Sequence, residues 1–409
     1  MTTPLRVALV GIGGFGGAHL SAIECLEREG LMRLVAVADP GSDRFPELKQ
    51  TLHTRGVRWH SLLADLLKNE SDLDAVTIAT PIPLHYEMTR ACIDQGLFVY
   101  LEKPPVPSIQ QLGELIEFDT RSRVTAGFQM ILSRFVQQLK SMIIEGRLGD
   151  LLEIRACACW PRRDNYYNRA AWAGRLLLDG EPVFDGPATN ALAHLIHNIM
   201  FLAAPGAEEF DVPVEVQGEL YRSRPIESYD SACFRGGFRS GVRFTAAFTH
   251  AVAETMPFRI EARGTKGWAR IAGDGMRFEQ NTSEPVEDGE NTHDLLLKTH
   301  REFACFATGS LPRVSTLLRD TRGYVLATNG MLVSSGGIHD IGAEHIRRYE
   351  TDGDFGFDVT GMRDAIEETF QTGRLFSEQG VPWAKATQSI SLENLHAIDF
   401  SKYTVPLQH

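Results

Sequence analysis

Three glycines near the N-terminus have the spacing of a turn that binds phosphate. Gly11, Gly13 and Gly16 fit the pattern GxGxxG. The first glycine of this pattern allows a tight turn, the second lets the backbone approach a pyrophosphate, and the third lets a helix pack against a strand. Free amides at the start of that helix can hold the phosphates. We therefore predict dinucleotide contacts from the whole turn: Gly11, Ile12, Gly13, Gly14, Phe15 and Gly16.

The residues around the glycine turn have the pattern that a dinucleotide site requires. Residues 7–10 form an apolar run, and from Ala18 the apolar positions recur at helical spacing. A second apolar run, residues 34–38, ends at Asp39, where a carboxylate can accept hydrogen bonds from an adenosine ribose. A 2′-phosphate would meet this negative charge, so Asp39 favours NAD over NADP. The alternative is a flavodoxin-like α/β domain whose turn binds no nucleotide.

A lysine at a strand end can serve the chemistry of such a cofactor. Oxidation of an alcohol delivers a hydride to the nicotinamide and a proton to a base. Residues 98–101 form an apolar run that ends in Glu102, Lys103 and Pro104. An ammonium at that strand end can hydrogen-bond the substrate oxygen and stabilise developing negative charge. We predict that Lys103 is catalytic and that Glu102 and Lys103 border the cofactor; alternatively, Lys103 pairs with Glu102 or solvent.

Two histidines lie in an almost wholly apolar segment, residues 190–204, which predicts a buried helix. Asn190, His194 and His197 would lie on one face of it, at i, i+4 and i+7. Polar groups in a buried helix need partners, so this stripe indicates the wall of a site. We predict His194 as the proton acceptor and Asn190 and His197 as substrate contacts. The alternative is a pair of core histidines bonded to backbone carbonyls.

Residues 160–175, WPRRDNYYNRAAWAGR, combine aromatic, arginine and asparagine side chains without a helical or strand period. Such a mixture suits the wall of a sugar pocket, and we predict substrate contacts from Tyr166, Tyr167, Arg169 and Trp172. Its arginines would equally suit a carboxylate or a phosphate. The alternative is an ordered loop that only packs against the nucleotide-binding domain.

Apolar strands alternate with helices throughout the first third of the chain, which predicts a doubly wound parallel sheet with ligands at the carboxyl ends of its strands. Thr80, Pro81 and Gln129 follow strand ends, and we predict that they and His85 contact the cofactor; His85 would equally cap the helix that it begins. From about residue 130, several strand-like runs are joined by turns, as in an antiparallel sheet. We predict a dinucleotide-binding Rossmann domain over residues 1–128 and a substrate-binding and oligomerisation domain over 129–409.

The composition restricts the possible partners. A net charge of −12 argues against nucleic acid and against an acidic membrane surface. No segment is long and apolar enough to span a membrane. The six cysteines show no metal-binding or disulfide pattern, so we expect reduced thiols in a cytoplasmic protein and no metal.

Several motifs together resemble the glucose–fructose oxidoreductase, inositol dehydrogenase and MocA family (Gfo/Idh/MocA). Besides the glycine turn, they are ATPIPLH at 79–85, EKP at 102–104, GFQ at 127–129, the histidine-bearing helix near His194, EARGTKG at 261–267 and NGMLVSS at 329–335. The resemblance implies a C-terminal α+β domain with a large, open, mostly antiparallel sheet. It also implies oxidation or reduction of sugars and polyols with NAD or NADP, and it supports the roles of Lys103 and His194.

The chain departs from this family at one helix. Relatives usually read DxGxH there, whereas this chain has Asn190 and Leu192 before His194. Asparagine can orient an imidazole but cannot stabilise its cation by charge, so we expect His194 to be a weaker base. Asp185 is a candidate substitute if its loop folds back.

These observations predict an NAD-dependent oxidoreductase that acts on a hydroxyl of a sugar, polyol or related carbohydrate. One alternative is a redox-neutral sugar-modifying enzyme, of glycosidase, lyase or epimerase type, whose tightly bound NAD is reduced only transiently. Another is a nucleotide-binding regulator without turnover. Because a large open sheet needs cover for its edges and face, we expect a homodimer or homotetramer.

Overall fold

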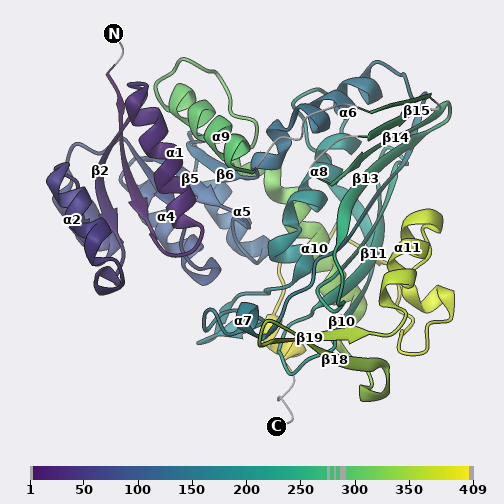
Figure 1. Ribbon diagram of the computed structural model, residues 1–409. Coiled ribbons are helices and arrows are strands. Elements are labelled where there is room, and N and C mark those ends of the chain that lie inside the picture. Colours follow the sequence, from purple (N-terminus) through teal and green to yellow (C-terminus); the bar gives the residue numbers. More distant parts are fainter. Residues whose placement is uncertain (1–2, 274–276, 281, 286–291, 405–409) are drawn as a thin grey trace. The chain divides into compact units, whose positions relative to one another are not determined.

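The computed structural model in Figure 1 describes residues 3–273, 277–280, 282–285 and 292–404. The chain forms two compact units, each built from separate stretches of sequence. The first unit comprises Met1–Val106, Gln111–Ser133 and Asn291–Thr321. The second comprises Pro107–Gln110, Arg134–Glu290 and Arg322–His409.

The first unit contains a six-stranded sheet in the order β3-β2-β1-β4-β5-β6. Every neighbouring pair in this sheet is parallel. Its central strands are buried almost throughout, which explains their continuous apolar runs. The predicted doubly wound parallel sheet is therefore confirmed. The strands are β1 (Leu5–Val10), β2 (Met32–Ala38), β3 (Arg58–His60), β4 (Ala75–Ile78), β5 (Phe98–Glu102) and β6 (Val124–Gly127).

Helices follow these strands in the alternation that parallel pairing requires. They are α1 (Gly16–Arg28), α2 (Pro46–Thr54), α3 (Leu63–Asn69), α4 (His85–Asp94) and α5 (Ile109–Phe118).

A later helix, α9 (Thr292–Ala307), completes the core of the first unit. Leu296 and Phe303 are fully buried in one apolar cluster with Ile23 and Leu26 of α1. Residues 316–317 then join the edge of the sheet, where the amide of Ala126 donates to the carbonyl of Thr316 at 3.1 Å. The sequence analysis assigns this stretch to the second domain, whereas the structure places Asn291–Thr321 with the first unit.

The second unit is built on an eight-stranded sheet whose central path runs β14-β13-β7-β12-β11-β10-β17. Among the described strands of this second sheet, only the pairs β7–β12 and β10–β17 are parallel, so the expected mostly antiparallel sheet is confirmed. The strands are β7 (Leu151–Cys159), β10 (Pro213–Arg222), β11 (Ser231–Phe238), β12 (Arg243–Thr249), β13 (Met256–Gly264), β14 (Gly267–Ala272), β17 (His339–Asp340) and β20 (Ile390–Ser391). Three small hairpins accompany it: β8 (Leu177–Leu178) with β9 (Glu181–Pro182), β15 (Arg277–Gln280) with β16 (Thr282–Pro285), and β18 (Ile346–Thr351) with β19 (Asp354–Val359).

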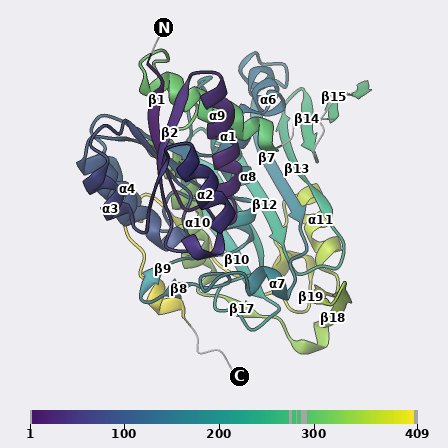
Figure 2. The same ribbon diagram turned by 60° about the vertical axis from the view of Figure 1, so that its left-hand side comes forward.

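Helices cover this second sheet on both faces (Figures 1 and 2). On one face lie α8 (Ala193–Ala203) and α10 (Arg322–Ser335), with α6 (Arg134–Ile144) packed against α8. The approach of α10 to β10 is close, because a Cβ at Gly218 would lie 2.7 Å from Met331 Cγ. On the other face, α11 (Met362–Thr372) packs Ile366 and Phe370 into a cluster with Cys157 and Ala247 of the sheet.

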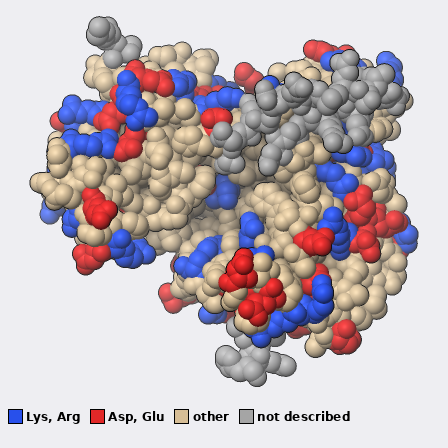
Figure 3. Space-filling model, viewed as in Figure 1, with Lys and Arg blue, Asp and Glu red and all other residues tan. Residues whose placement is uncertain are grey.

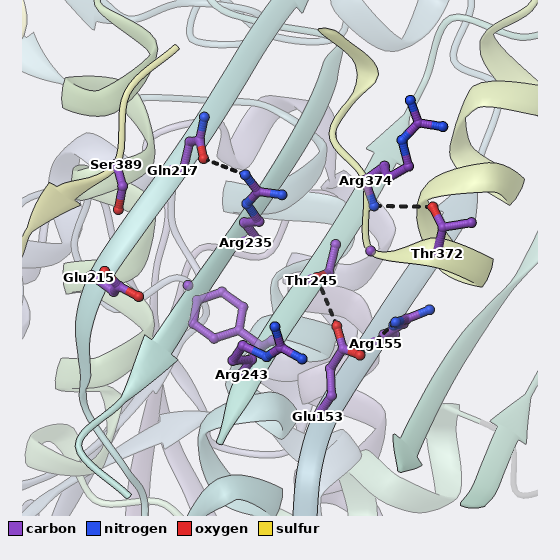
Figure 4. Close-up of a pocket in the computed structure, with 13 residues that line it drawn as sticks. Glu153, Arg155, Glu215, Gln217, Arg235, Arg243, Thr245, Thr372, Arg374 and Ser389 are labelled. Atoms are coloured by element: carbon purple, nitrogen blue, oxygen red, sulfur yellow. Dashed lines mark hydrogen bonds and ion pairs between the residues drawn. The ribbon is translucent and has the colours of Figure 1, made fainter. Parts of the chain in front are cut away.

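Charged side chains of both signs are interspersed on the surface seen in Figure 3. Beside α11, the sheet face becomes a polar groove of about 420 Å³. Its strands present Glu153, Arg155, Arg235 and Arg243 (Figure 4), and Glu153 bonds both Arg155 and Thr245. In this part of the sheet face, the side chains are therefore held by ion pairs and hydrogen bonds rather than by apolar packing. None of the helices in the described ranges combines the length and the apolar character that crossing a membrane would require.

The placement of α9 predicts a large contribution of Phe303 to stability. We expect Phe303→Ala to lower the free energy of unfolding by about 3–5 kcal/mol, because a buried aromatic ring is replaced by a cavity. Phe306→Ala on the same helix is the matched control, since Phe306 is only half-buried, and it should cost less than half as much. Urea unfolding of the three proteins measures both values, and equal losses would contradict the placement of α9.

A buried lysine caps the C-terminal end of α8. Lys140 of α6 is almost fully buried, and its ammonium donates to the carbonyls of Phe201 and Ala204 in the last turn of α8. Burial lowers the pKa of Lys140 from 10.5 to about 8. The last carbonyls of a helix lack partners within it, so Lys140 supplies the donors that they need.

We predict that the stabilisation by Lys140 depends on pH. Between about pH 8 and about pH 10.5 the unfolded chain keeps a proton that the folded chain has lost, so this residue contributes more stability as the pH rises. Lys140→Met removes both donors and should cost about 1–3 kcal/mol. Urea unfolding across this pH range should show that the difference in free energy of unfolding between wild type and Lys140→Met increases with pH. A difference that stays constant or decreases would contradict the prediction.

Candidate active site

The glycine turn after β1 leaves no room for side chains at two positions. Gly11 has a φ of +87°, and a Cβ there would lie 2.6 Å from the carbonyl oxygen of Ala79. A Cβ at Gly16 would lie 2.1 Å from the carbonyl oxygen of Gly11. Both positions therefore require glycine. The turn brings the start of α1 against the strand, and contact of its backbone amides with a pyrophosphate stays a prediction.

Asp39 joins the end of β2 to this turn. Its carboxylate is nearly buried and accepts hydrogen bonds from the amides of Ile12, at 2.9 Å, and Gly41, at 2.7 Å. Arg44 lies 3.6 Å from the same carboxylate. A carboxylate has further lone pairs, so Asp39 can also accept from ribose hydroxyls. The turn and the acid together fit the adenosine half of a dinucleotide.

His85 ties two strand-end loops together. Its ring is buried, with Nδ1 2.9 Å from the carbonyl oxygen of Pro104 and Nε2 2.9 Å from that of Thr80. Burial lowers the pKa of His85, while the two carbonyls oppose that effect. Both ring nitrogens of His85 therefore face backbone carbonyls, which favours a structural role for this residue. Pro81, next to Thr80, is exposed. Cofactor contact by His85 stays a prediction.

The ends of β5 and β6 carry the other predicted residues of the first unit. Lys103 is half-buried, and its backbone amide donates to Glu102 Oε2 at 3.0 Å. Gln129 follows β6, and its buried Oε1 has no hydrogen-bond partner among the described residues. That oxygen can accept from the carboxamide of a nicotinamide. The other oxygen of Glu102 lies 3.2 Å from His19, a residue that the sequence analysis does not single out although it lies three positions after the glycine turn.

In the second unit, a loop brings Asp185 to Asn190. Oδ1 of Asp185 accepts from the Asn190 amide at 2.8 Å, and Oδ2 accepts from the backbone of Gly174 at 2.7 Å. Asp185 is almost fully buried. The loop thus folds back as the sequence analysis requires if Asp185 is to supply the carboxylate that Asn190 lacks.

The helix predicted over residues 190–204 is shorter than expected. Asn190 lies in a π-helical segment, Pro187–Ala191, and α8 begins only at Ala193, after a break at Leu192. The expected i, i+4, i+7 stripe on one α-helix is therefore wrong for Asn190. A π turn widens the backbone locally, and π turns often occur at functional sites.

The two histidines of α8 have different surroundings. His194 is half-buried in the first turn of the helix. His197 is fully buried and stacks on Phe210, with ring centroids 4.7 Å apart. Burial and the neighbouring His194 hold the pKa of His197 well below its ordinary value. This placement favours a core role for His197, and substrate contact by it stays a prediction.

The aromatic loop places two of its predicted residues, Tyr166 and Trp172, around a third, Arg169. The guanidinium of Arg169 lies 3.6 Å from the ring centroid of Tyr166 and 4.6 Å from that of Trp172. It also lies 4.0 Å from Asp185 Oδ2. Tyr167 instead packs under Arg224, with its hydroxyl buried. The loop thus places Arg169, Tyr166 and Trp172 beside the Asp185–Asn190 pair.

His250 is a further candidate site residue, and no sequence pattern predicts it. It follows β12, its ring lies 5.8 Å from that of Tyr166, and its Nδ1 lies 2.7 Å from the carbonyl oxygen of Trp160. Its Nε2 is buried without a hydrogen-bond partner among the described residues. Burial, with nearby arginines, lowers the pKa of His250 to about 3, so the ring is neutral. No local pattern marks it, because the loop that it supports is distant in sequence.

Two protein-family models match the chain. Residues 5–128 match the oxidoreductase family with an NAD-binding Rossmann fold. Residues 136–270 match the GFO/IDH/MocA C-terminal domain. Lys103 falls within the first match and His194 within the second.

Curated relatives align with part of the chain. An inositol 2-dehydrogenase from Streptomyces avermitilis is 33% identical over 152 residues, which cover 36% of this chain and 43% of the relative. The D-glucoside 3-dehydrogenase of Escherichia coli is 27% identical over 186 residues, which cover 45% of this chain and 51% of the relative. The chain thus spans about half the length, or less, of these relatives.

Solved structures share the fold at low identity. Levoglucosan dehydrogenase in complex with NADH has a TM-score of 0.70 at 18% identity, covering 81% of this chain and 97% of that one. The WlbA dehydrogenase from Bordetella pertussis, in complex with NADH and UDP-GlcNAcA, has a TM-score of 0.67 at 22% identity, covering 81% and 96%. About a fifth of this chain therefore lies outside the shared fold.

The position of Asp39 predicts the choice of cofactor. Asp39→Ala should weaken NADH binding by about 10- to 100-fold, because charge-assisted hydrogen bonds are lost, and should weaken NADPH binding far less. Asp43→Ala, which removes an exposed acid on the next turn, should change neither affinity. Fluorescence titration with both cofactors measures this, and a wild type that prefers NADPH would show that the carboxylate is misassigned.

The Asp185–Asn190 pair predicts that exchanging the two residues restores the stability that each single substitution removes. Asn190→Asp brings two carboxylates together and Asp185→Asn two amides, so each should cost about 1–3 kcal/mol of stability. In the double variant Asp185→Asn/Asn190→Asp, an amide again faces a carboxylate, so stability should return to within about 1 kcal/mol of the wild type. Urea unfolding of the four proteins tests this, and additive losses in the double variant would refute the pairing.

Proposed function

Because the chain belongs to the Gfo/Idh/MocA family of oxidoreductases, we propose that it transfers hydride between NAD and a hydroxyl-bearing carbon of a sugar, polyol or related carbohydrate. The observation that carries this proposal is the set of strand ends in the first unit. There Gly11, Asp39 and Lys103 follow three strands of one parallel sheet. Phosphate, ribose and reacting oxygen each find the type of group that binds them.

The cofactor supplies the hydride acceptor, and the protein supplies binding and proton transfer. The glycine turn and Asp39 would hold the adenosine half, with Thr80, Pro81 and Gln129 toward the nicotinamide. Asp39 favours NAD, with NADP the weaker ligand. Lys103 hydrogen-bonds the reacting oxygen and stabilises the negative charge that develops as its proton leaves.

His194 is the base that takes the proton from the substrate hydroxyl. Asn190 orients the polar groups around it, and Asp185 behind Asn190 contributes negative charge to the same region. The rings of Tyr166 and Trp172 can pack against C–H faces of a sugar, while Arg169 between them presents donors to hydroxyls. These roles predict that the substrate is bound chiefly by the second unit.

The names of the relatives suggest the substrate class. The relatives include an inositol 2-dehydrogenase and a D-glucoside 3-dehydrogenase, so an inositol or a glucoside is the first candidate here. The departure at Asn190 keeps a redox-neutral reaction as the second candidate, because a weaker base suits a reversible step in which the hydride later returns. That alternative predicts product without net NADH. A nucleotide-binding regulator without turnover would leave Lys103 and His194 without a catalytic function.

The charge of the protein and its cysteines support the proposed partners and cellular location. The net charge of −12 and the mixed charges of Figure 3 disfavour nucleic acid and acidic membranes. The six cysteines are free thiols, which suits the cytoplasm. Within the described residues, no cluster of histidine, cysteine or acidic side chains suits a metal ion. We expect a homodimer or homotetramer formed through the sheet of the second unit, including the polar groove of Figure 4.

The proposal predicts which variants lose activity. Purified protein is incubated with NAD and a panel of inositols, glucosides, levoglucosan and free sugars, while nicotinamide absorbance and sugar products are followed together. Lys103→Met and His194→Ala should each lower the rate by about 100-fold or more. Lys402→Met and His396→Ala, at exposed positions, are the matched controls and should retain full activity.

The outcomes separate the candidate functions. NADH that accumulates in step with a keto product supports the dehydrogenase. Product without net NADH, lost in the same two variants, supports the redox-neutral reaction instead. NADH binding without any turnover across the panel would favour the regulator.

A further inference from the structure

Two histidines that the proposed chemistry does not use lie behind the end of β5. His19 of α1 and His300 of α9 are fully buried and 281 residues apart in sequence. Nδ1 of His19 and Nε2 of His300 are 2.8 Å apart, a hydrogen-bond distance. On its other side, Nε2 of His19 lies 3.2 Å from Oε1 of Glu102, an electrostatic contact. The three side chains form one polar line through an apolar core.

The proton positions along this line follow from Glu102. An ionised carboxylate attracts a protonated nitrogen, so we place the proton of His19 on Nε2, which lies 3.2 Å from Glu102 Oε1 in an electrostatic contact without hydrogen-bond geometry. Nδ1 of His19 then accepts from the Nε2–H of His300. Burial, with His19 beside it, holds the pKa of His300 well below its ordinary value, so this second ring is neutral.

The line ends inside the protein. Nδ1 of His300 is buried without a hydrogen-bond partner among the described residues. The ring stacks on Tyr100, with centroids 4.3 Å apart and an interplanar angle of 16°. A proton relay needs a hydrogen-bonded exit, and within the described part of the chain Nδ1 of His300 has none. The arrangement is therefore suited to holding a group in place.

We propose that His19, supported by His300, is a positioning residue for the catalytic lysine. Glu102 is the link, because its Oε1 faces His19 while its Oε2 accepts from the backbone amide of Lys103 at 3.0 Å. His19 fixes the Glu102 carboxylate, and the carboxylate fixes the peptide from which the Lys103 side chain extends. The kinetic consequence rests on the proposed function, in which Lys103 binds the reacting oxygen.

The surroundings of Glu102 define what a loss of His19 would change. The titratable groups near this carboxylate include His19 from α1, His85 from α4 and Tyr100 from its own strand, and the backbone amide of Lys103 donates to it. Replacing His19 by an apolar ring leaves a buried carboxylate with one favourable contact fewer. Glu102 would then take up a proton at higher pH, and the peptide of Lys103 would lose its fixed acceptor.

Three variants separate positioning from packing. His19→Phe keeps a ring but has no polar atoms. His19→Gln keeps a planar polar group with an amide NH2 donor and a carbonyl acceptor, so it can replace both the donor and the acceptor of the neutral imidazole. Tyr100→Phe is the packing control, because it removes a buried hydroxyl that contacts Thr299 at 3.2 Å and leaves the ring on His300.

We expect kcat to fall by about 10- to 100-fold in His19→Phe, since small misplacement of a reacting group costs this much. KM for the substrate should stay within about threefold, as should the affinity for NADH, because His19 touches neither ligand. His19→Gln should recover most of kcat, and Tyr100→Phe should keep it. A glutamine variant as impaired as the phenylalanine variant, at equal thermal stability, would overturn the proposal.

A second measurement does not depend on turnover. In protein labelled with ¹³C at glutamate carboxyls, the Glu102 signal is identified by its absence in Glu102→Gln. Its protonation should move to higher pH in His19→Phe and return toward the wild type in His19→Gln. An unchanged Glu102 titration in His19→Phe would refute the positioning role. If the wild type turns over no substrate, the proposed function fails, while this titration still decides the role of His19.

Discussion

Parallel register is the constraint on which the first unit depends. Val10 of β1 pairs with Ala38 of β2 and with Ile78 of β4, Ile78 pairs with Leu101, and Leu101 pairs with Ala126. Every strand therefore ends at the same edge of the sheet, and each residue that follows is delivered to that edge. The proposed chemistry uses the residues after the strands, and the register brings these together although the sequence separates some of them by more than a hundred positions.

Buried carboxylates organise both units in the same way. Asp39, Glu102 and Asp185 are each nearly inaccessible, and each accepts a hydrogen bond from a backbone amide of a functional loop. A buried charge is costly unless donors surround it, so each carboxylate draws a loop into one conformation. In the second unit this also explains Asn190, since an aspartate there would face Asp185 as a second charge. In each unit, taken by itself, a buried acid therefore fixes a loop that carries predicted site residues.

Local patterns were sufficient for the glycine turn, the strand ends and the two sheets, because strand periodicity and glycine geometry depend on neighbours in sequence. They were insufficient where distant segments meet. The return of α9 to α1, the contact between His19 and His300, and the support of the aromatic loop by His250 all depend on tertiary packing. The break at Leu192 was missed because an apolar segment gives the same signal for one helix as for a π turn followed by a helix.

The position of α9 in the chain also has a consequence during synthesis. Leu296 and Phe303 complete the apolar cluster that contains Ile23 and Leu26. At about 5–20 residues per second, roughly 15–60 s separate the translation of α1 from that of α9. Throughout this interval the nascent first unit exposes the apolar surface that α9 later covers. The part of the protein made first is therefore the part whose folding is completed late, after strands β7 and β10 to β14 of the second sheet have been synthesised.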